Sequence, residues 1–134
     1  MSEEIEIDYG TSFKLDDTGA LSFVGGDIEM IDGPDNVGQR IVIACTTELG
    51  EDQFNPDYGI DRFAIFGSDF GYDDTIAVFK EQLRRAILED EQILAVHDIT
   101  EEEMDYVNRI YSFTVNVELV GGESYIANVL GVRV

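Results

Sequence analysis

The strongest constraint on the fold is a strict alternation of apolar and polar residues near the end of the chain. Apolar side chains occupy every second position of one stretch: Tyr111, Phe113, Val115, Val117 and Leu119. The positions between them are polar: Ser112, Thr114, Asn116 and Glu118. A period of two is typical of a strand with one buried and one open face. Gly121-Gly122 then predicts a two-residue hairpin turn of the primed type, and residues 124–134 return as the last strand.

The N-terminal third shows shorter strand patterns and then a helix start. Residues 12–15 and 20–24 flank a turn signal and predict an N-terminal hairpin, and 27–31 reads as a short extended segment. Asp35 or Asn36 is the expected N-cap of the helix that follows. The clearest helix of the chain comes later, and its pattern predicts a second main element.

That second helix is expected over 75–90, with Glu81 and Arg85 spaced as an i,i+4 ion pair. A strand over 93–99 follows it, and the acidic residues 100–103 either extend this strand or end it. The apolar stretch 62–69 stays unassigned. Strands, helix, loop, helix and strands in this order predict a small α+β domain with antiparallel C-terminal strands.

The expected boundaries are simple. Residues 1–10, MSEEIEIDYG, predict a loosely held acidic arm, and residues 11–134 form the single domain. No apolar run approaches the ~20 residues that cross a bilayer. The acidic arm lacks the basic region of a signal peptide. We therefore expect no membrane partner, and a protein that is made and assembled in the cytoplasm of a host cell.

The charge of the chain is unusual and narrows the choice of partners. Asp and Glu total 29 residues and Lys and Arg total 8, which gives a net charge of −21. Phosphate recognition needs a basic surface, so the charge argues against a nucleic-acid partner. Self-repulsion destabilises such a chain at low salt, whereas the Debye length falls to about 3 Å at 1 M salt. We therefore expect a halophilic source, an archaeon or its virus.

A helix, a glycine turn and an aromatic loop occupy the middle of the chain. One helix face carries Val37, Ile41, Ala44 and Cys45, and the pattern stops at TTELG, residues 46–50. Gly50 suits the left-handed conformation that follows many helix ends. The loop then ends in FNPDYG, residues 54–59, which places a turn between two aromatic residues.

This run resembles a motif of the baseplate wedge family of contractile phage tails, which includes the small T-even wedge protein and the baseplate assembly protein W. The positions that match are Gln39, Ile41, Thr46 or Thr47, Gly50, Glu51, Phe54, Pro56, Tyr58 and Gly59. Residues 88–96, LEDEQILAV, resemble a later family segment, and the order of elements agrees over nearly the full length. The resemblance implies a structural, non-enzymatic part of a viral tail baseplate or tail-like injection machine, present in several copies around the tail axis and without cofactor or metal.

The resemblance also implies two partner-binding surfaces. The first consists of the motif residues Gln39, Thr46, Thr47, Gly50, Glu51, Phe54, Pro56, Tyr58 and Gly59. In the family, the charged pair after the glycine is associated with docking onto the wedge core, a bundle of larger baseplate proteins. Glu51 would keep this role, with Thr46 or Thr47 bonding the helix end or the loop amides. Asp52 stands where the family has arginine, so this half of the contact is lost or inverted in charge, unless the partner, Arg40 or Arg62 supplies the basic group.

The second implied surface is the terminal strands, which would template the sheath or tube by strand addition. Its expected partner-binding residues are Tyr125, Ile126, Val129 and Val132. The alternative is that the last strand is internal and already paired on both sides. A non-contractile tail would carry a similar sequence, so the pattern does not separate sheath from tube partners.

Other functions have weaker support in the residues. Cys45, the lone cysteine, is expected to be a buried and unreactive side chain. His97, the lone histidine, has no nucleophile elbow or metal motif around it. Glu48 and Glu51 flank the glycine turn and are the first carboxylate pair to test for the alternative function, a lysozyme-like glycan hydrolase acting on the cell envelope. A stand-alone acidic binding module is the third hypothesis.

Overall fold

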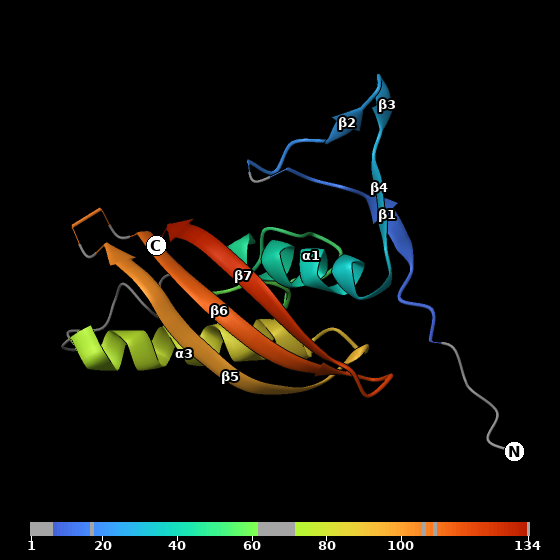
Figure 1. Cartoon of the computed structure of the whole chain (residues 1–134). Coiled ribbons are helices and arrows are strands. Elements are labelled where there is room, and N and C mark those ends of the chain that lie inside the picture. Colours follow the sequence, from blue (N-terminus) through green and yellow to red (C-terminus); the bar gives the residue numbers. More distant parts are fainter. Residues whose placement is uncertain (1–6, 17, 62–71, 106, 109, 134) are drawn as a thin grey trace, which may run out of the picture.

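The computed structural model describes residues 7–16, 18–61, 72–105, 107–108 and 110–133. The elements are β1 (Thr11–Phe13), β2 (Phe23–Val24), β3 (Asp27–Ile28), β4 (Met30–Asp32), α1 (Gly33–Thr46), α3 (Tyr72–Leu88), β5 (Ile93–Asp105), β6 (Ile110–Leu119) and β7 (Ser124–Arg133). The antiparallel sheet has the order β5-β6-β7, and α1 and α3 cover its concave face (Figure 1). The chain is therefore an α+β domain with an N-terminal hairpin and C-terminal antiparallel strands, as the sequence predicts.

The core lies between β6 and the two helices. Phe113, Val115, Val117 and Leu119 of β6 are fully buried, which confirms the face assigned from the alternation. The ring of Phe79 in α3 packs against the ring of Phe113 with centroids 5.0 Å apart. Each such side chain contributes about 1.5–3 kcal/mol through burial, so β6 is the element on which the rest of the domain is built.

The turn between β6 and β7 differs from the expected primed turn. The Gly122 N–H donates to the Leu119 carbonyl at 2.9 Å, and the Leu119 N–H donates to the Glu123 carbonyl at 2.9 Å. Gly122 has a φ of 94°, whereas Gly121 is not in the left-handed region. A primed type I turn needs positive φ at both central residues, so the prediction of a two-residue primed turn is wrong. The connection is instead a turn followed by a glycine bulge.

Helix boundaries also differ from the expected ones. Asp32 is the N-cap of α1, without a side-chain cap bond, and Pro34 lies in the first turn. The prediction of Asp35 or Asn36 was wrong because proline's fixed φ suits the first turn of a helix. The amide of Asn36 instead points inward and donates to the Tyr9 carbonyl at 2.9 Å. Similarly, α3 begins at Tyr72, and its expected Glu81–Arg85 pair is replaced by Arg84–Glu81 at 3.7 Å.

The strand β5 is longer than predicted because the acidic residues 100–103 extend it. It pairs with β6 from Ile93 to Asp105, with three register shifts along the way. These shifts bend the strand and let it follow the curved sheet.

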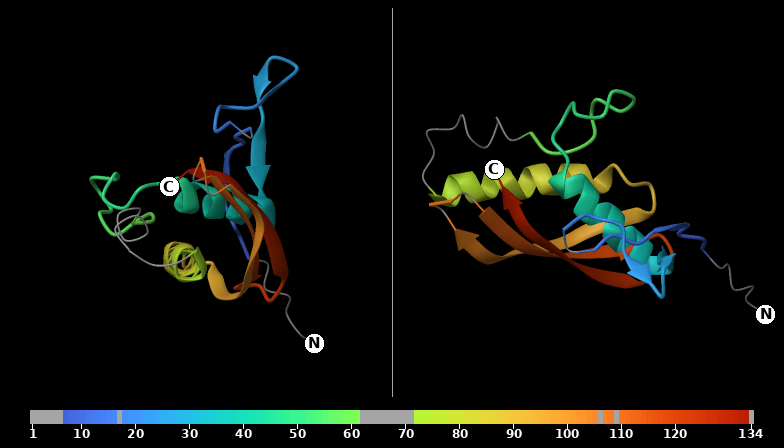
Figure 2. Two further views of the ribbon diagram at one scale, coloured as in Figure 1. Left: turned by 90° about the vertical axis from the view of Figure 1, so that its left-hand side faces the viewer. Right: turned by 90° about the horizontal axis from the view of Figure 1, so that it is seen from above.

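The N-terminal hairpin, residues 11–32, projects from the domain as a narrow ribbon (Figure 2). We call this segment the ribbon. β1 pairs with β4 and β2 with β3, while the expected pairing of 12–15 with 20–24 is reduced to one bridge, Leu15↔Leu21. β1 and β2 therefore lie end to end along β4 and β3, and residues 14–22 between them form a side loop. Cross-strand pairing and alternation place four exposed apolar residues on one face of this ribbon: Phe13, Phe23, Ile28 and Met30.

The expected loose arm is wrong for residues 7–10. Tyr9 is buried, and its carbonyl accepts hydrogen bonds from Asn36 Nδ2 and Arg40 Nη1, each at 2.9 Å. Its hydroxyl contacts Glu123 and accepts from the Gly121 N–H at 2.9 Å. The rest of the expected arm, residues 1–6, and the unassigned stretch 62–69 lie outside the described residues.

Candidate functional site

The loop that follows α1 is closed on itself by backbone hydrogen bonds. The Leu49 N–H donates to the Ile60 carbonyl at 2.8 Å, and the Ile60 N–H donates to the Thr47 carbonyl at 2.9 Å. The Thr46 and Thr47 hydroxyls donate to carbonyls of the last helix turn, at 2.8 and 2.7 Å. This confirms the expected bonding of the threonines and turns residues 47–60 into a defined projection, which we call the motif loop.

The motif loop depends on glycine at its closing end. Gly59 has a φ of 104°, and a Cβ added there would lie 2.6 Å from the Thr47 carbonyl oxygen. Arg85 of α3 donates to the Gly59 carbonyl at 2.9 Å, so the helix fixes the loop in place. Gly50 also has a positive φ, but the helix ends at Thr47 as its C-cap. Gly50 therefore shapes the turn after the helix end and is not the residue that ends it.

The tip of the motif loop is anionic and carries an exposed aromatic ring. Glu51 Oε2 accepts from the Glu48 N–H at 3.2 Å, and Asp52 Oδ1 accepts from the Phe54 N–H at 2.9 Å. Phe54 is 98% exposed, and Pro56 beside it is exposed as well. Asp52 therefore holds the tip through its own backbone contact, a role that an arginine side chain does not fill.

Tyr58 of the motif and Arg40, a candidate substitute for the family arginine, both serve the fold. Tyr58 is half-buried against the core, and burial raises the pKa of its phenol. Arg40 does not lie beside Glu51: its guanidinium binds the Asp90 carboxylate at 2.6 Å and the Gln92 amide oxygen at 2.6 Å. Arg62, the other expected substitute for the family arginine, lies outside the described residues.

Gln39, expected as a partner-binding residue, is engaged within the chain. Its Oε1 accepts from the Leu15 N–H at 2.9 Å, and its Nε2 donates to the Phe13 carbonyl at 2.8 Å. The side-chain amide thus pairs with the backbone of the ribbon as another strand would. Gln39 fastens the ribbon to α1, and its role in the described residues is internal.

The second surface is the outer edge of β7. Antiparallel pairs alternate between those that exchange hydrogen bonds and those that do not. Because Leu119 donates to Glu123 and the register then runs unbroken to Phe113↔Val129, the bonded residues of β7 are Tyr125, Ala127 and Val129. The backbone groups of Ile126 and Asn128 therefore point outward. Within the described residues, no other strand pairs with this edge.

The expected residues of this strand separate by face. Val129 and Val132 are buried in the core, so only their backbone can reach a partner. Ile126 is 61% exposed. Tyr125 is half-buried, with its ring against Gly38 and its hydroxyl donating to Asp35 Oδ1 at 3.0 Å. The two valines were selected from the sequence because they are apolar. The alternation of faces along a strand would instead have pointed to Asn128, which lies two residues from Ile126 and is exposed like it.

The residues considered for catalysis lie outside the groove beside β7 and outside a second, smaller cavity. Glu48 and Glu51 line neither the groove beside β7, of about 880 Å³, nor a smaller cavity of about 190 Å³. Cys45 is buried as expected, and burial raises the pKa of its thiol to about 12. His97 lies exposed on β5. In the part of the chain described, no cluster of His, Cys, Asp and Glu could hold a metal ion, and no helix has the length and apolarity to span a bilayer.

Comparison with known proteins gives two positive findings. A family model described as the contractile injection system sheath initiator matches residues 11–122. The fold is also similar to a crystal structure from Geobacter sulfurreducens whose protein carries the provisional description tail lysozyme, with a TM-score of 0.58 and 14% identity over 75% of this chain and 90% of that one. At this identity the likeness shows the fold alone. No curated protein sequence matches.

Proposed function

The chain belongs to the contractile injection system sheath initiator family, and from this premise we propose that it is a baseplate component that starts the sheath by strand addition at β7. Its role is structural and needs no catalytic residue. The edge of β7 presents free backbone donors and acceptors, and a sheath subunit that adds a strand there continues the sheet. Later subunits then repeat the geometry that the first contact sets.

The observation that carries this proposal is the outward edge at Ile126 and Asn128. Residues 124–130, SYIANVL, contain no charge, proline or glycine that would obstruct pairing. Their inward side chains, Ala127 and Val129, are held in the core, which fixes the strand before any partner arrives. A rigid, unobstructed edge is what a template requires, because ordering the strand costs nothing further at the moment of binding.

We assign the motif loop to attachment on the baseplate side. Phe54, almost fully exposed, is the aromatic anchor, and Glu51 supplies charge next to it. Aromatic side chains that fill a pocket dominate many protein interfaces. The expected partner is a wedge core of larger baseplate proteins, and it should offer basic groups, since Asp52 has replaced the family arginine. Several copies would surround the tail axis in the virion or injection particle.

The test of sheath initiation uses one edge position. Asn128→Pro removes an outward N–H and inserts a ring at the edge, a place where proline is compatible with a strand. Asn128→Ala keeps the N–H and is the matched control. On baseplates reconstituted with each variant and the sheath protein of the same particle, electron microscopy should show sheath on Asn128→Ala and bare baseplates on Asn128→Pro. Normal sheath on both variants would refute strand addition at β7.

The test of attachment uses the loop tip. Phe54→Ala should reduce co-purification of the chain with baseplates by about tenfold or more, because it removes an exposed aromatic anchor. Phe23→Ala, an exposed aromatic residue on the ribbon, is the matched control and should keep normal incorporation. Equal incorporation of both variants would place the baseplate contact elsewhere.

A lysozyme-like activity is the second candidate, since a structural neighbour carries that provisional description. The geometry favours it less, because Glu48 and Glu51 lie in an open turn and do not line the groove beside β7. The Glu51 carboxylate instead accepts a hydrogen bond from the Glu48 N–H. Envelope suspensions should keep their turbidity when the protein is added. Clearing that is lost in Glu48→Gln or Glu51→Gln would replace the structural proposal with the enzymatic one.

A further inference from the structure

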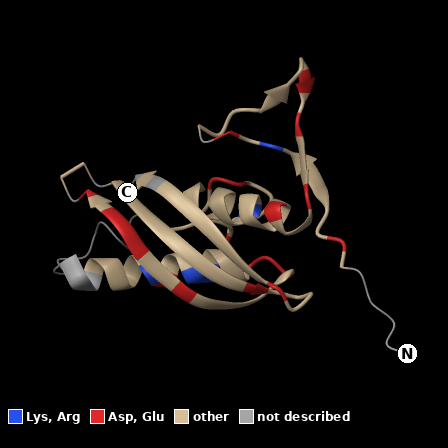
Figure 3. Cartoon of the chain, in the orientation of Figure 1, with Lys and Arg blue, Asp and Glu red and all other residues tan. Residues whose placement is uncertain are grey.

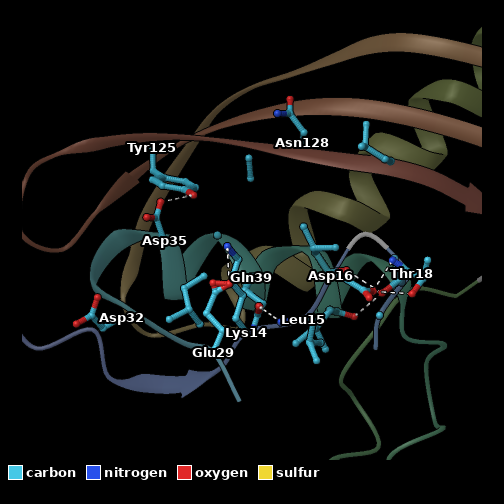
Figure 4. Close-up of a pocket in the computed structure, with 18 of the residues that line it drawn as sticks. Lys14, Leu15, Asp16, Thr18, Glu29, Asp32, Asp35, Gln39, Tyr125 and Asn128 are labelled. Carbon is cyan, nitrogen blue, oxygen red and sulfur yellow. Dashed lines mark hydrogen bonds and ion pairs between the residues drawn. The ribbon is translucent and has the colours of Figure 1, made fainter. Parts of the chain in front are cut away.

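A groove of about 880 Å³ runs along the free edge of β7 (Figure 4). One wall is β7 itself, the floor is α1, and the far wall is the ribbon. A strand that adds to β7 must lie in this groove, so the groove decides which strands fit. The inference below rests on the proposed function and concerns the chemistry of that strand.

One stripe of α1 faces the groove. Its residues follow the spacing of a single helix face: Asp35, Gly38, Gln39, Val42, Ile43 and Thr46. Asp35 lies at the end near Tyr125, to which it is bonded, and the apolar pair Val42 and Ile43 lies further along. Alternate side chains of an added strand point toward α1 and would meet this stripe in order. Starting from the end near Tyr125, the added strand therefore meets an acidic residue of α1 first and the apolar pair next.

The ribbon wall places another acid at the far end. Asp16 lies beside Thr18, away from Asp32 and Asp35, which occupy the opposite end of the groove (Figure 4). Hydrogen bonds from the Thr18 hydroxyl and N–H hold the pKa of Asp16 below its usual value, so it stays charged. Lys14, a cation of this wall, is already paired with Glu29 at 3.4 Å. Both ends of the groove are thus anionic, and the stretch between them holds the apolar pair Val42 and Ile43 together with Gln39 and the mutually paired Lys14 and Glu29.

We propose that the groove selects an extended partner segment with a basic residue at each end and apolar residues between them. The α1 stripe from Asp35 to Thr46 spans about 16 Å at 1.5 Å per residue. At about 3.3 Å per residue, a strand covers this length with roughly five residues. The partner is therefore a short, uncharged β-segment flanked by Lys or Arg, and an acidic segment such as the β5 strand of another copy of this chain is rejected.

The ribbon takes part as a wall that Gln39 holds in place. Its amide donates to the Phe13 carbonyl and accepts from the Leu15 N–H, and these two hydrogen bonds fix the distance between the ribbon and α1. Gln39→Ala should leave the sheet intact and weaken binding of the basic-ended segment by about threefold to tenfold, because the ribbon is then no longer held at a fixed distance from α1.

The experiment compares two synthetic peptides of about eight residues, each with alternating Val and Thr and with either Lys or Glu near both ends. Binding to the full chain is followed by fluorescence anisotropy at 0.5 M KCl, with concentrations up to millimolar. The Lys peptide should bind about tenfold more tightly than the Glu peptide or better. Asn128→Pro should abolish binding of the Lys peptide, and Asn128→Ala should preserve it.

Charge specificity is tested by two variants with the same change in net charge. Asp16→Asn with Asp35→Asn should erase the preference for Lys, whereas Glu102→Gln with Glu103→Gln on β5 should retain it. Equal binding of both peptides, or no binding of either, would overturn the selection by charge. If the peptides fail to show this preference but sheath assembly is still lost with Asn128→Pro, initiation at β7 remains supported and only the selection by charge is wrong. Failure of the inference and failure of the proposed function can therefore be told apart.

Discussion

The two edges of the same sheet are built in opposite ways. β5 carries a run of acidic residues, including Glu101, Glu102 and Glu103, and its pairing with β6 shifts register three times. β7 is uncharged from Ser124 to Leu130, and its register with β6 is unbroken from Ser124 to Val129 (Figure 3). Charges and bulges are the usual protection of an edge against unwanted pairing.

The contrast shows which edge is available to a partner. Lys80 of α3 pairs with Glu101, so one of the β5 acids is also tied to the helix beneath it. Tyr125 of β7 is bonded to Asp35 of α1, but residues 124–130 carry no charge, and the open side of the strand faces the groove between α1 and the ribbon. Protection of one edge and exposure of the other leave one side of the domain open to strand addition, as the proposed role in starting a sheath requires.

The largest expected effect concerns β6, which supports both edges. Phe113→Ala should lower the free energy of unfolding by about 4 kcal/mol, because it removes a fully buried ring from the core. Ile126→Ala on the exposed face of β7 should cost less than about 0.5 kcal/mol. Denaturant unfolding monitored by circular dichroism measures both. Similar costs would mean that the outer face of β7 is already covered in the free protein.

The rates of backbone amide hydrogen exchange should alternate from residue to residue along β7. The N–H groups of Ala127 and Val129 point to β6 and should exchange roughly a hundredfold more slowly than those of Ile126 and Asn128. Two-dimensional NMR after transfer to D₂O resolves the four amides. Equal protection of all four would show that another segment pairs with the edge, and the contrast between β5 and β7 would no longer hold.

Salt should act on the whole domain and not on one edge. At a net charge of −21, repulsion among the acids opposes folding, and screening relieves it. The thermal midpoint should therefore rise steadily between 0.1 and about 1 M KCl. A midpoint that does not change with salt would remove the case for a halophilic source while leaving the comparison of the edges untouched.

The smallest expected effect tests the protection of β5. Replacing Glu102 and Glu103 together by Thr should give weak self-association at high protein concentration, worth about 1 kcal/mol or less, because like charges no longer face each other across paired edges. Glu89→Thr with Glu91→Thr changes the charge equally outside the strand and should stay monomeric. Sedimentation velocity measures both; identical profiles would mean that the bulges alone protect β5.

The sequence predicted the elements whose pattern is long and regular. The alternation in β6 gave the buried face correctly, because one side of the strand packs on helices and the other does not. The turn at Gly121-Gly122 was mispredicted because glycine permits several turns, and the contact of Gly121 with Tyr9 is long-range. Tyr9 itself looked like part of a loose arm, since its partners lie on α1 and beyond β6.

The candidate site was predictable in outline only. The motif loop and the last strand could be selected from the chain, but not the division of their residues between fold and surface. Gln39 matches the family pattern, yet its amide binds the ribbon, which no local spacing indicates. The outward groups of Ile126 and Asn128 follow from the hydrogen bond at the hairpin turn, so they required the register of β6 and β7.

The most direct test of sheath initiation at β7 is a cryo-electron microscopy reconstruction of the junction between baseplate and sheath in the assembled particle. We predict an extended sheath segment beside β7, bonded to the backbone of Ile126 and Asn128 and flanked by basic residues near Asp16 and Asp35. A sheath strand on the β5 edge, or a β7 edge left open beneath a fully formed sheath, would contradict the account.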